Sequence, residues 1–157
     1  MKKLKIYLET TVFNRYFEPE RDNYRDTVRL FEEIAEEKFE AYASEYVLEE
    51  LSRTEGPKLQ NMLELLEQCG AILLKKSDEI EALAYQYAVH EIISENHEYD
   101  RWHIACASVH GMDALVSLNF THINRLWTKD KMRYVNPLNG YPAVSIIAPM
   151  EVINNGN

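Results

Sequence analysis

The sequence has little of what marks a secreted or membrane-spanning protein. Its two cysteines, Cys69 and Cys106, form no CxxC pair and lie in apolar helical patterns. We therefore expect small buried hydrophobic residues rather than a disulfide or a zinc site. No apolar run approaches the roughly 20 residues that span a bilayer. The first four residues, MKKL, lead into a strand rather than into a signal peptide's apolar segment. We expect a cytoplasmic protein that does not enter a membrane.

Basic residues are also scarce, since 17 Lys and Arg stand against 26 Asp and Glu and give a net charge of -9. This balance argues against a protein that coats polyanions, because neutralising phosphates requires a local excess of Lys and Arg. It is compatible with an enzyme that binds the phosphate groups of its substrate through a metal ion. One basic cluster contains an aromatic residue that could stack on a base, and we interpret it as a solvated surface: Arg125, Trp127, Lys129, Lys131 and Arg133.

Repeats, low-complexity tracts and Gly/Pro/Ser-rich linkers are absent from the 157 residues, so we expect a single domain over 1–157. Strand-like runs alternate with helical patterns, which is typical of an α/β domain with a mainly parallel sheet. Ser44 and Ser77 are predicted to cap helices, and Pro57 to begin one. After a first strand that ends at Glu9, the expected strands are 39–44, 71–76, 114–119 and 143–148.

Acidic and amide side chains lie near the ends of these elements. Glu9 ends the first strand, Asn119 ends the strand 114–119, and Asp100 lies in the first turn of a helix. Glu49 or Glu50 lies in the helix that follows the second strand. In a parallel sheet, ligands bind beyond the carboxyl ends of the strands, and oxygen ligands suit Mg²⁺ or Mn²⁺. With 26 acidic residues, however, some carboxylates fall there by chance, so the spacing leaves a structural role open.

Four segments resemble the PIN-domain proteins, a family that includes metal-dependent ribonucleases and toxins of prokaryotic toxin–antitoxin pairs. They are IYLETTVFNRYF, YASEYVLEELSR, YDRWHIACASVHGMDALVSLNFTHI and NPLNGYPAVSIIAPMEV. The third is the most specific, because a helical Asp and His precede small residues and then a strand that ends Ser-x-Asn-Phe. The resemblance implies a three-layer α/β/α sandwich around a mainly parallel sheet.

The resemblance also implies a site. It assigns catalytic and metal-binding roles to Glu9, Glu50, Asp100 and Asn119, with Mg²⁺ or Mn²⁺ as the cofactor. Glu50 is preferred to Glu49 because it directly precedes a leucine, as in the family's Glu-aliphatic pair. Two positions depart from the family: Glu9 replaces the more usual Asp, and Asn119 offers a neutral oxygen. Both departures should weaken metal binding.

The function implied is that of a Mg²⁺- or Mn²⁺-dependent endoribonuclease, with RNA as its substrate. A role as the toxin of a toxin–antitoxin pair, an antitoxin partner and a homodimer are left open. The alternative is a catalytically degenerate domain of this fold that binds RNA or a protein without cleavage. A third reading is a metal-dependent phosphatase that acts on small substrates.

Several other polar residues can be interpreted either as structural or as functional. His103 lies three residues after Asp100 and could touch the site, but we interpret it as a hydrogen-bonded core residue. His122 is expected to bond loop backbone. Thr10 and Ser117 could orient a metal-bound water, and Thr10 could equally cap a helix. The remaining histidines show no ligand spacing with one another: His90, His97 and His110.

Overall fold

The computed structural model describes residues 2–155 and contains a five-stranded, entirely parallel sheet in the order β3-β2-β1-β4-β5. The strands are β1 (Leu4–Leu8), β2 (Phe39–Ser44), β3 (Ile72–Leu74), β4 (Ala114–Val116) and β5 (Ser145–Ile147). The helices are α1 (Thr10–Arg15), α2 (Tyr24–Ala35), α3 (Glu45–Leu51), α4 (Pro57–Gln68), α5 (Asp78–Val89), α6 (Glu98–Val109), α7 (Leu126–Leu138) and α8 (Pro149–Asn155).

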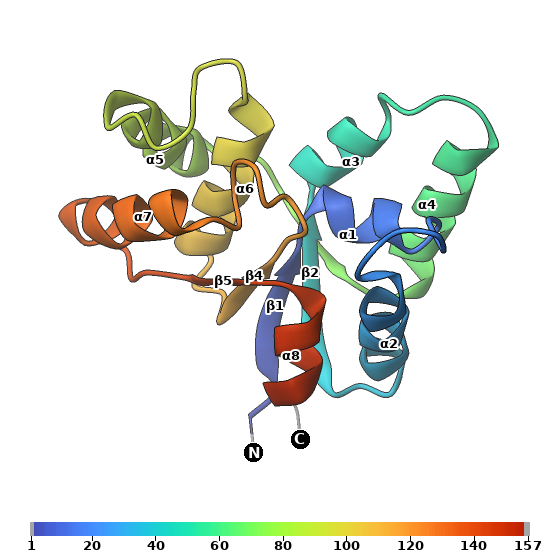
Figure 1. The fold of residues 1–157 in the computed structure, drawn as a ribbon. Coiled ribbons are helices and arrows are strands. Elements are labelled where there is room, and N and C mark those ends of the chain that lie inside the picture. The colour runs from blue at the N-terminus through green and yellow to red at the C-terminus, as the bar shows by residue number, and fades with distance from the viewer. Residues whose placement is uncertain (1, 156–157) are drawn as a thin grey trace.

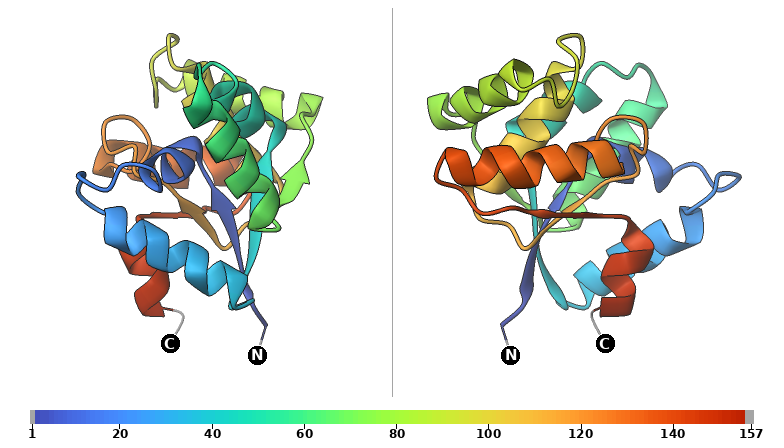
Figure 2. Two further views of the ribbon diagram at one scale, coloured as in Figure 1. Left: turned by 90° about the vertical axis from the view of Figure 1, so that its right-hand side faces the viewer. Right: turned by 60° about the vertical axis from the view of Figure 1, so that its left-hand side comes forward.

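The helices form two layers around the sheet (Figure 1). Helices α5, α6 and α7 lie on one side, and α1, α2 and α4 lie on the other, where α8 packs against α2. The predicted α/β/α sandwich with a parallel sheet is therefore confirmed. β1 begins and α8 ends at the same end of the molecule in both views of Figure 2. That end lies opposite the carboxyl edge of the sheet.

Burial explains the order of the strands. The central strand β1 has no exposed surface at Ile6, Tyr7 and Leu8, and it pairs with β2 on one side and β4 on the other. Strands covered on both faces are rich in apolar residues, and the buried half of β1 is Ile6, Tyr7 and Leu8, with the hydroxyl of Tyr7 hydrogen-bonded to Ser44. β3 is an edge strand in which Ile72 and Leu73 are exposed.

Local signals set several helix ends where the sequence predicts them. The Oγ of Ser44 accepts from the backbone N–H of Val47, and the Oγ of Ser77 accepts from that of Ile80. Pro57 is the first residue of α4. Gly111 follows α6 with a φ of 63°, a conformation that glycine adopts without strain.

The structure differs from the sequence-based predictions in the length of three strands and in two helices. β3, β4 and β5 cover only the central or first residues of the predicted strands 71–76, 114–119 and 143–148. Beyond β4, Ser117 still donates its backbone N–H to the carbonyl oxygen of Ile147 in β5. Helix α7 was not predicted, because its apolar residues are more often exposed than buried and Pro137 lies in its last turn. Helix α8 was also not predicted. Within residues 2–155, no helix combines the length and apolar character needed to cross a bilayer.

Candidate active site

Three carboxylates meet at the carboxyl edge of the sheet. Glu9 directly follows β1, Glu50 lies on α3, and Asp100 lies in the first turn of α6. Glu9, Glu50 and His103 each place one potential ligand atom within 4.8 Å of the others. Asp100 is close enough for the charges of Glu9 and Glu50 to raise its pKa. The structure thus groups Glu9 with Glu50 and His103, and it places Asp100 near enough to be influenced by their charges.

Glu9 is held in a buried pocket of hydroxyl groups and is only 1% exposed. Its Oε1 accepts from the Oγ of Ser117 at 2.7 Å and from the Oγ1 of Thr11 at 2.6 Å. Its Oε2 accepts from the backbone N–H of Thr11, so Glu9 rather than Thr10 caps α1. Burial raises the pKa of Glu9 even against these hydrogen bonds. The end of β1 therefore fixes a carboxylate in place beside His103, whose charge favours the ionised form of Glu9.

Glu50 pairs with a histidine inside the core. The Nε2 of His103 lies 2.8 Å from the Oε1 of Glu50, and its Nδ1 lies 2.8 Å from the hydroxyl of Tyr7. Burial opposes charge on both groups, but their mutual attraction outweighs it, lowering the pKa of Glu50 and raising that of His103. His103 is thus the hydrogen-bonded core residue that was predicted, and it also contacts the acidic cluster directly.

The neighbouring residue Glu49 points elsewhere. It pairs with the ammonium group of Lys76, and it accepts from the hydroxyl of Tyr99 at 3.2 Å. Of the two adjacent glutamates, only Glu50 belongs to the group formed with Glu9 and His103.

Asp100 is joined to the loop after β4 through Asn119. The amide Nδ2 of Asn119 donates to Oδ1 of Asp100 at 3.2 Å, and its Oδ1 accepts from the backbone N–H of His122 at 3.0 Å. A backbone N–H can only donate, which fixes the orientation of this amide. Burial, together with the charge of Glu9, raises the pKa of Asp100 to about 6. Asn119 thus holds Asp100 in place through a hydrogen bond, and a role of Asn119 as a metal ligand stays a prediction.

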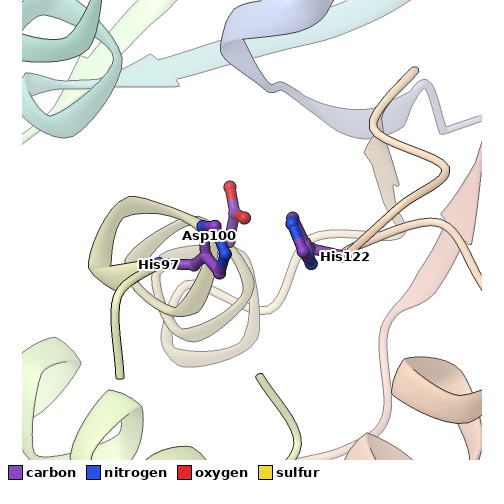
Figure 3. Close-up of side chains that lie close together, drawn as sticks. All are labelled: His97, Asp100 and His122. Carbon is purple, nitrogen blue, oxygen red and sulfur yellow. The ribbon is translucent and has the colours of Figure 1, made fainter. Parts of the chain in front are cut away.

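Two histidines that the sequence did not associate lie on the other side of Asp100. His97 immediately precedes α6, and His122 lies in the loop after β4. Their rings stack with centroids 3.9 Å apart, and the carboxylate of Asp100 lies beside them (Figure 3). One ligand atom from each of the three residues lies within 4.8 Å of the others. The sequence offered one signal of this association. His97 and Asp100 are three residues apart, a spacing that places side chains on the same face of a helix.

A pocket of about 470 Å³ opens beside these side chains and includes Asn119 in its wall. Arg21, which is more than half exposed, and Phe120, which is 50% exposed, also line it. The basic cluster noted in the sequence lies elsewhere, because Trp127 lines a different pocket and stacks under the ammonium group of Lys131. Asn119 and Thr11, which hydrogen-bond Asp100 and Glu9, therefore border a cavity that offers both an arginine and an exposed aromatic ring.

The donor set suits a hard divalent cation. The cluster holds three carboxylates and one histidine that can carry a balancing charge, and the pKa values of Glu9 and Asp100 are both raised. Burial is the main cause of both shifts, and the charge of Glu9 adds to the shift of Asp100. Mg²⁺ and Mn²⁺ bind through such oxygen atoms and retain coordinated waters. The residues present therefore fit an ion of this class.

Comparison with known proteins supports the architecture. No family model matches the sequence, and no curated protein does. The fold is similar to that of a chain in a solved crystal structure. It comes from the crystal structure of VapBC2 from Rickettsia felis bound to a DNA fragment from their promoter, and it matches with a TM-score of 0.56. The match covers 92% of this chain and 98% of that chain at 15% sequence identity. At this identity the likeness shows the fold alone.

Proposed function

We propose that this protein is a Mg²⁺- or Mn²⁺-dependent endoribonuclease of the PIN-domain type that acts as the toxin of a toxin–antitoxin pair. The proposal is supported by the grouping of Glu9, Glu50 and His103 at the carboxyl edge of a parallel sheet, with Asp100 close enough for their charges to act on it. Ligands bind at that edge in open α/β folds. The fold likeness to a chain of the VapBC2 toxin–antitoxin complex adds support at the level of architecture.

In this proposal the three carboxylates hold the ion, and each is oriented by a different neighbour. Ser117 and Thr11 fix Glu9, His103 fixes Glu50, and Asn119 fixes Asp100. Hydrogen-bond partners of this kind set the direction and basicity of metal ligands. When bound, the ion would lower the pKa of a coordinated water and stabilise charge on the scissile phosphate. No side chain is then needed as the nucleophile.

The pocket beside Asn119 supports RNA as the substrate. Arg21 supplies a guanidinium group suited to a phosphate, and the exposed ring of Phe120 offers a surface on which a base can stack. Binding through one arginine and one aromatic residue requires no extended basic surface. The net charge of -9 is therefore compatible with a single-stranded RNA substrate.

The test exploits the two adjacent glutamates on α3. Purified wild type, Glu50→Gln and Glu49→Gln are incubated with a mixed RNA pool in the presence of Mn²⁺. We expect Glu50→Gln to reduce the cleavage rate at least about 100-fold, because removing even a hydrogen-bond partner of a ligand costs about 10- to 100-fold. Glu49→Gln makes the same chemical change outside the cluster and should retain wild-type activity. Equal rates in all three proteins would refute a role for Glu50 in cleavage.

The hydrogen bonds within the cluster favour one alternative, a degenerate domain that binds RNA or a protein without cutting. Glu9 and Glu50 already have partners in the protein, as a cluster that no longer binds metal would require. Wild type that neither cleaves RNA nor binds Mn²⁺ in calorimetry would establish this alternative. Cleavage of a generic phosphate ester without cleavage of RNA would instead point to a phosphatase.

An antitoxin partner also belongs to the proposal, and the fold likeness to a chain of VapBC2 is its support. A homodimer stays a prediction. The mass of the purified protein in solution tests the homodimer. Inhibition of cleavage by the product of a neighbouring small gene tests the antitoxin.

A further inference from the structure

We propose that His97, Asp100 and His122 form a second metal site, selective for borderline divalent transition metals such as Zn²⁺ and Co²⁺. The three residues come from the start of α6 and from the loop after β4, so only the tertiary fold brings them together. The site is defined by two imidazoles and one carboxylate. It does not depend on the proposed ribonuclease activity, although it shares Asp100 with the acidic cluster.

The spacing of the donor atoms is close to that of a metal centre. One ligand atom from each residue lies within 4.8 Å of the other two. In a tetrahedral zinc site with bonds of about 2.0–2.1 Å, neighbouring ligand atoms lie about 3.3 Å apart. Each pair therefore needs to close by at most about 1.5 Å. Both histidines are only partly buried, so their rings are free to turn out of the stack in which they lie (Figure 3).

Asn119 provides the independent structural argument. Its side-chain amide donates to Asp100 and accepts from the backbone N–H of His122, so a single side chain ties together two of the three proposed ligands. Metal ligands are commonly oriented by such outer hydrogen bonds. Arg125 brings a positive charge toward His122, but its guanidinium group is engaged by Thr128 and by the carbonyl oxygen of Ile92.

The donor types determine the class of metal. Imidazole nitrogen binds zinc, cobalt, nickel and iron well, whereas Mg²⁺ and Ca²⁺ prefer oxygen ligands alone. Three protein ligands leave at least one coordination position for water or for a phosphate oxygen. The two groups of side chains therefore differ in preference: Glu9 and Glu50 suit a hard ion, and the histidine pair suits a borderline one. Asp100 lies between them.

The experiment measures binding of Zn²⁺ alone to the chelator-treated full-length protein by isothermal titration calorimetry. We expect His97→Ala and His122→Ala each to weaken one Zn²⁺ site at least tenfold. His110→Ala is the matched control, because His110 is an exposed histidine at the opposite end of α6, and it should bind as wild type does. Visible absorption of bound Co²⁺ should be lost in the same two variants and retained in the control.

Further variants separate this site from the ribonuclease proposal. Glu50→Gln should keep the histidine-dependent Zn²⁺ binding even where it abolishes RNA cleavage. Thermal unfolding of each apo variant checks folding, and His122→Gln provides a loop substitution that retains a polar side chain. If His97→Ala and His122→Ala, folded and tested separately, bind Zn²⁺ as tightly as wild type, the proposal is wrong. Absence of Zn²⁺ binding by the wild type would overturn it equally.

Discussion

Replacing Asp100 by asparagine should make the metal-free protein more stable. The change removes one charge from a buried group of carboxylates and keeps the shape of the side chain. The Oδ1 of the new amide can still accept from the Nδ2 of Asn119. Because burial and the charge of Glu9 raise the pKa of Asp100, the folded protein holds this carboxylate in its charged form only at a cost.

The size of the effect follows from the pKa of Asp100, which rises from an ordinary 3.8 to about 6. This is about two pKa units, and at 1.36 kcal/mol per unit the penalty at pH 7 is at most about 3 kcal/mol. An asparagine also loses hydration on burial, so we expect a gain of about 1 to 2 kcal/mol. For a protein of this length, that gain corresponds to a rise in melting temperature of about 2–8 °C.

The sign of the pH dependence is fixed by the direction of the shift. Below the unfolded pKa, Asp100 is protonated in both states and imposes no penalty. As the pH rises through the folded pKa of about 6, the penalty develops in full. The difference in melting temperature between Asp100→Asn and wild type should therefore be near zero below pH 4. It should reach its maximum above about pH 7.

The assay is thermal unfolding of both proteins in chelator across this pH range, followed by circular dichroism. Glu98→Gln is the matched control, because it removes an exposed carboxylate from the same first turn of α6. Its unfolding free energy should change by no more than about 0.5 kcal/mol. Added Mn²⁺ should stabilise wild type and leave Asp100→Asn unaffected. An Asp100→Asn protein that melts at or below wild type at pH 8 would refute the clustering argument.

Two more substitutions test how the site is built. Ser117→Ala removes the hydroxyl that donates to Oε1 of Glu9, and we expect it to slow RNA cleavage about 10- to 100-fold and to cost about 1–3 kcal/mol in urea unfolding. Unchanged values in both assays would contradict the positioning of Glu9 by Ser117. Phe120→Ala should weaken binding of single-stranded RNA by about 1–3 kcal/mol in a fluorescence titration and leave the melting temperature unchanged, since the ring is exposed. Equal RNA affinity would exclude stacking on Phe120.

The fold could be predicted because its signals are local. Ser44, Ser77 and Pro57 each specify a helix start through their own side chain or backbone, and these starts lie where the sequence predicts them. The run Ile6–Leu8 in β1 likewise indicates a strand segment that is buried on both faces. Helix α7 was not predicted because Leu126 and Trp127 face solvent, so its apolar residues do not follow a clean helical period.

Within the site, the sequence could indicate candidates but not their partners. The chain direction places Glu9, Glu50 and Asp100 near the carboxyl edge, and this is a property of a parallel sheet that the element order predicts. The contact between Glu50 and His103 joins residues 53 positions apart, and that between Asp100 and His122 depends on the path of a loop. Neither separation carries a periodic signal, so only the packed structure reveals them.

The charge balance of the cluster connects these observations. With all three carboxylates ionised and His103 protonated, the largely buried site would carry a net charge of -2, counted as three negative charges and one positive. His103 offsets part of this cost through Glu50, and a neutral Asn119 beside Asp100 avoids adding a fourth negative charge. Burial and the charge of Glu9 both raise the pKa of Asp100, so a divalent cation bound by these carboxylates would offset the repulsion between them and lower that pKa.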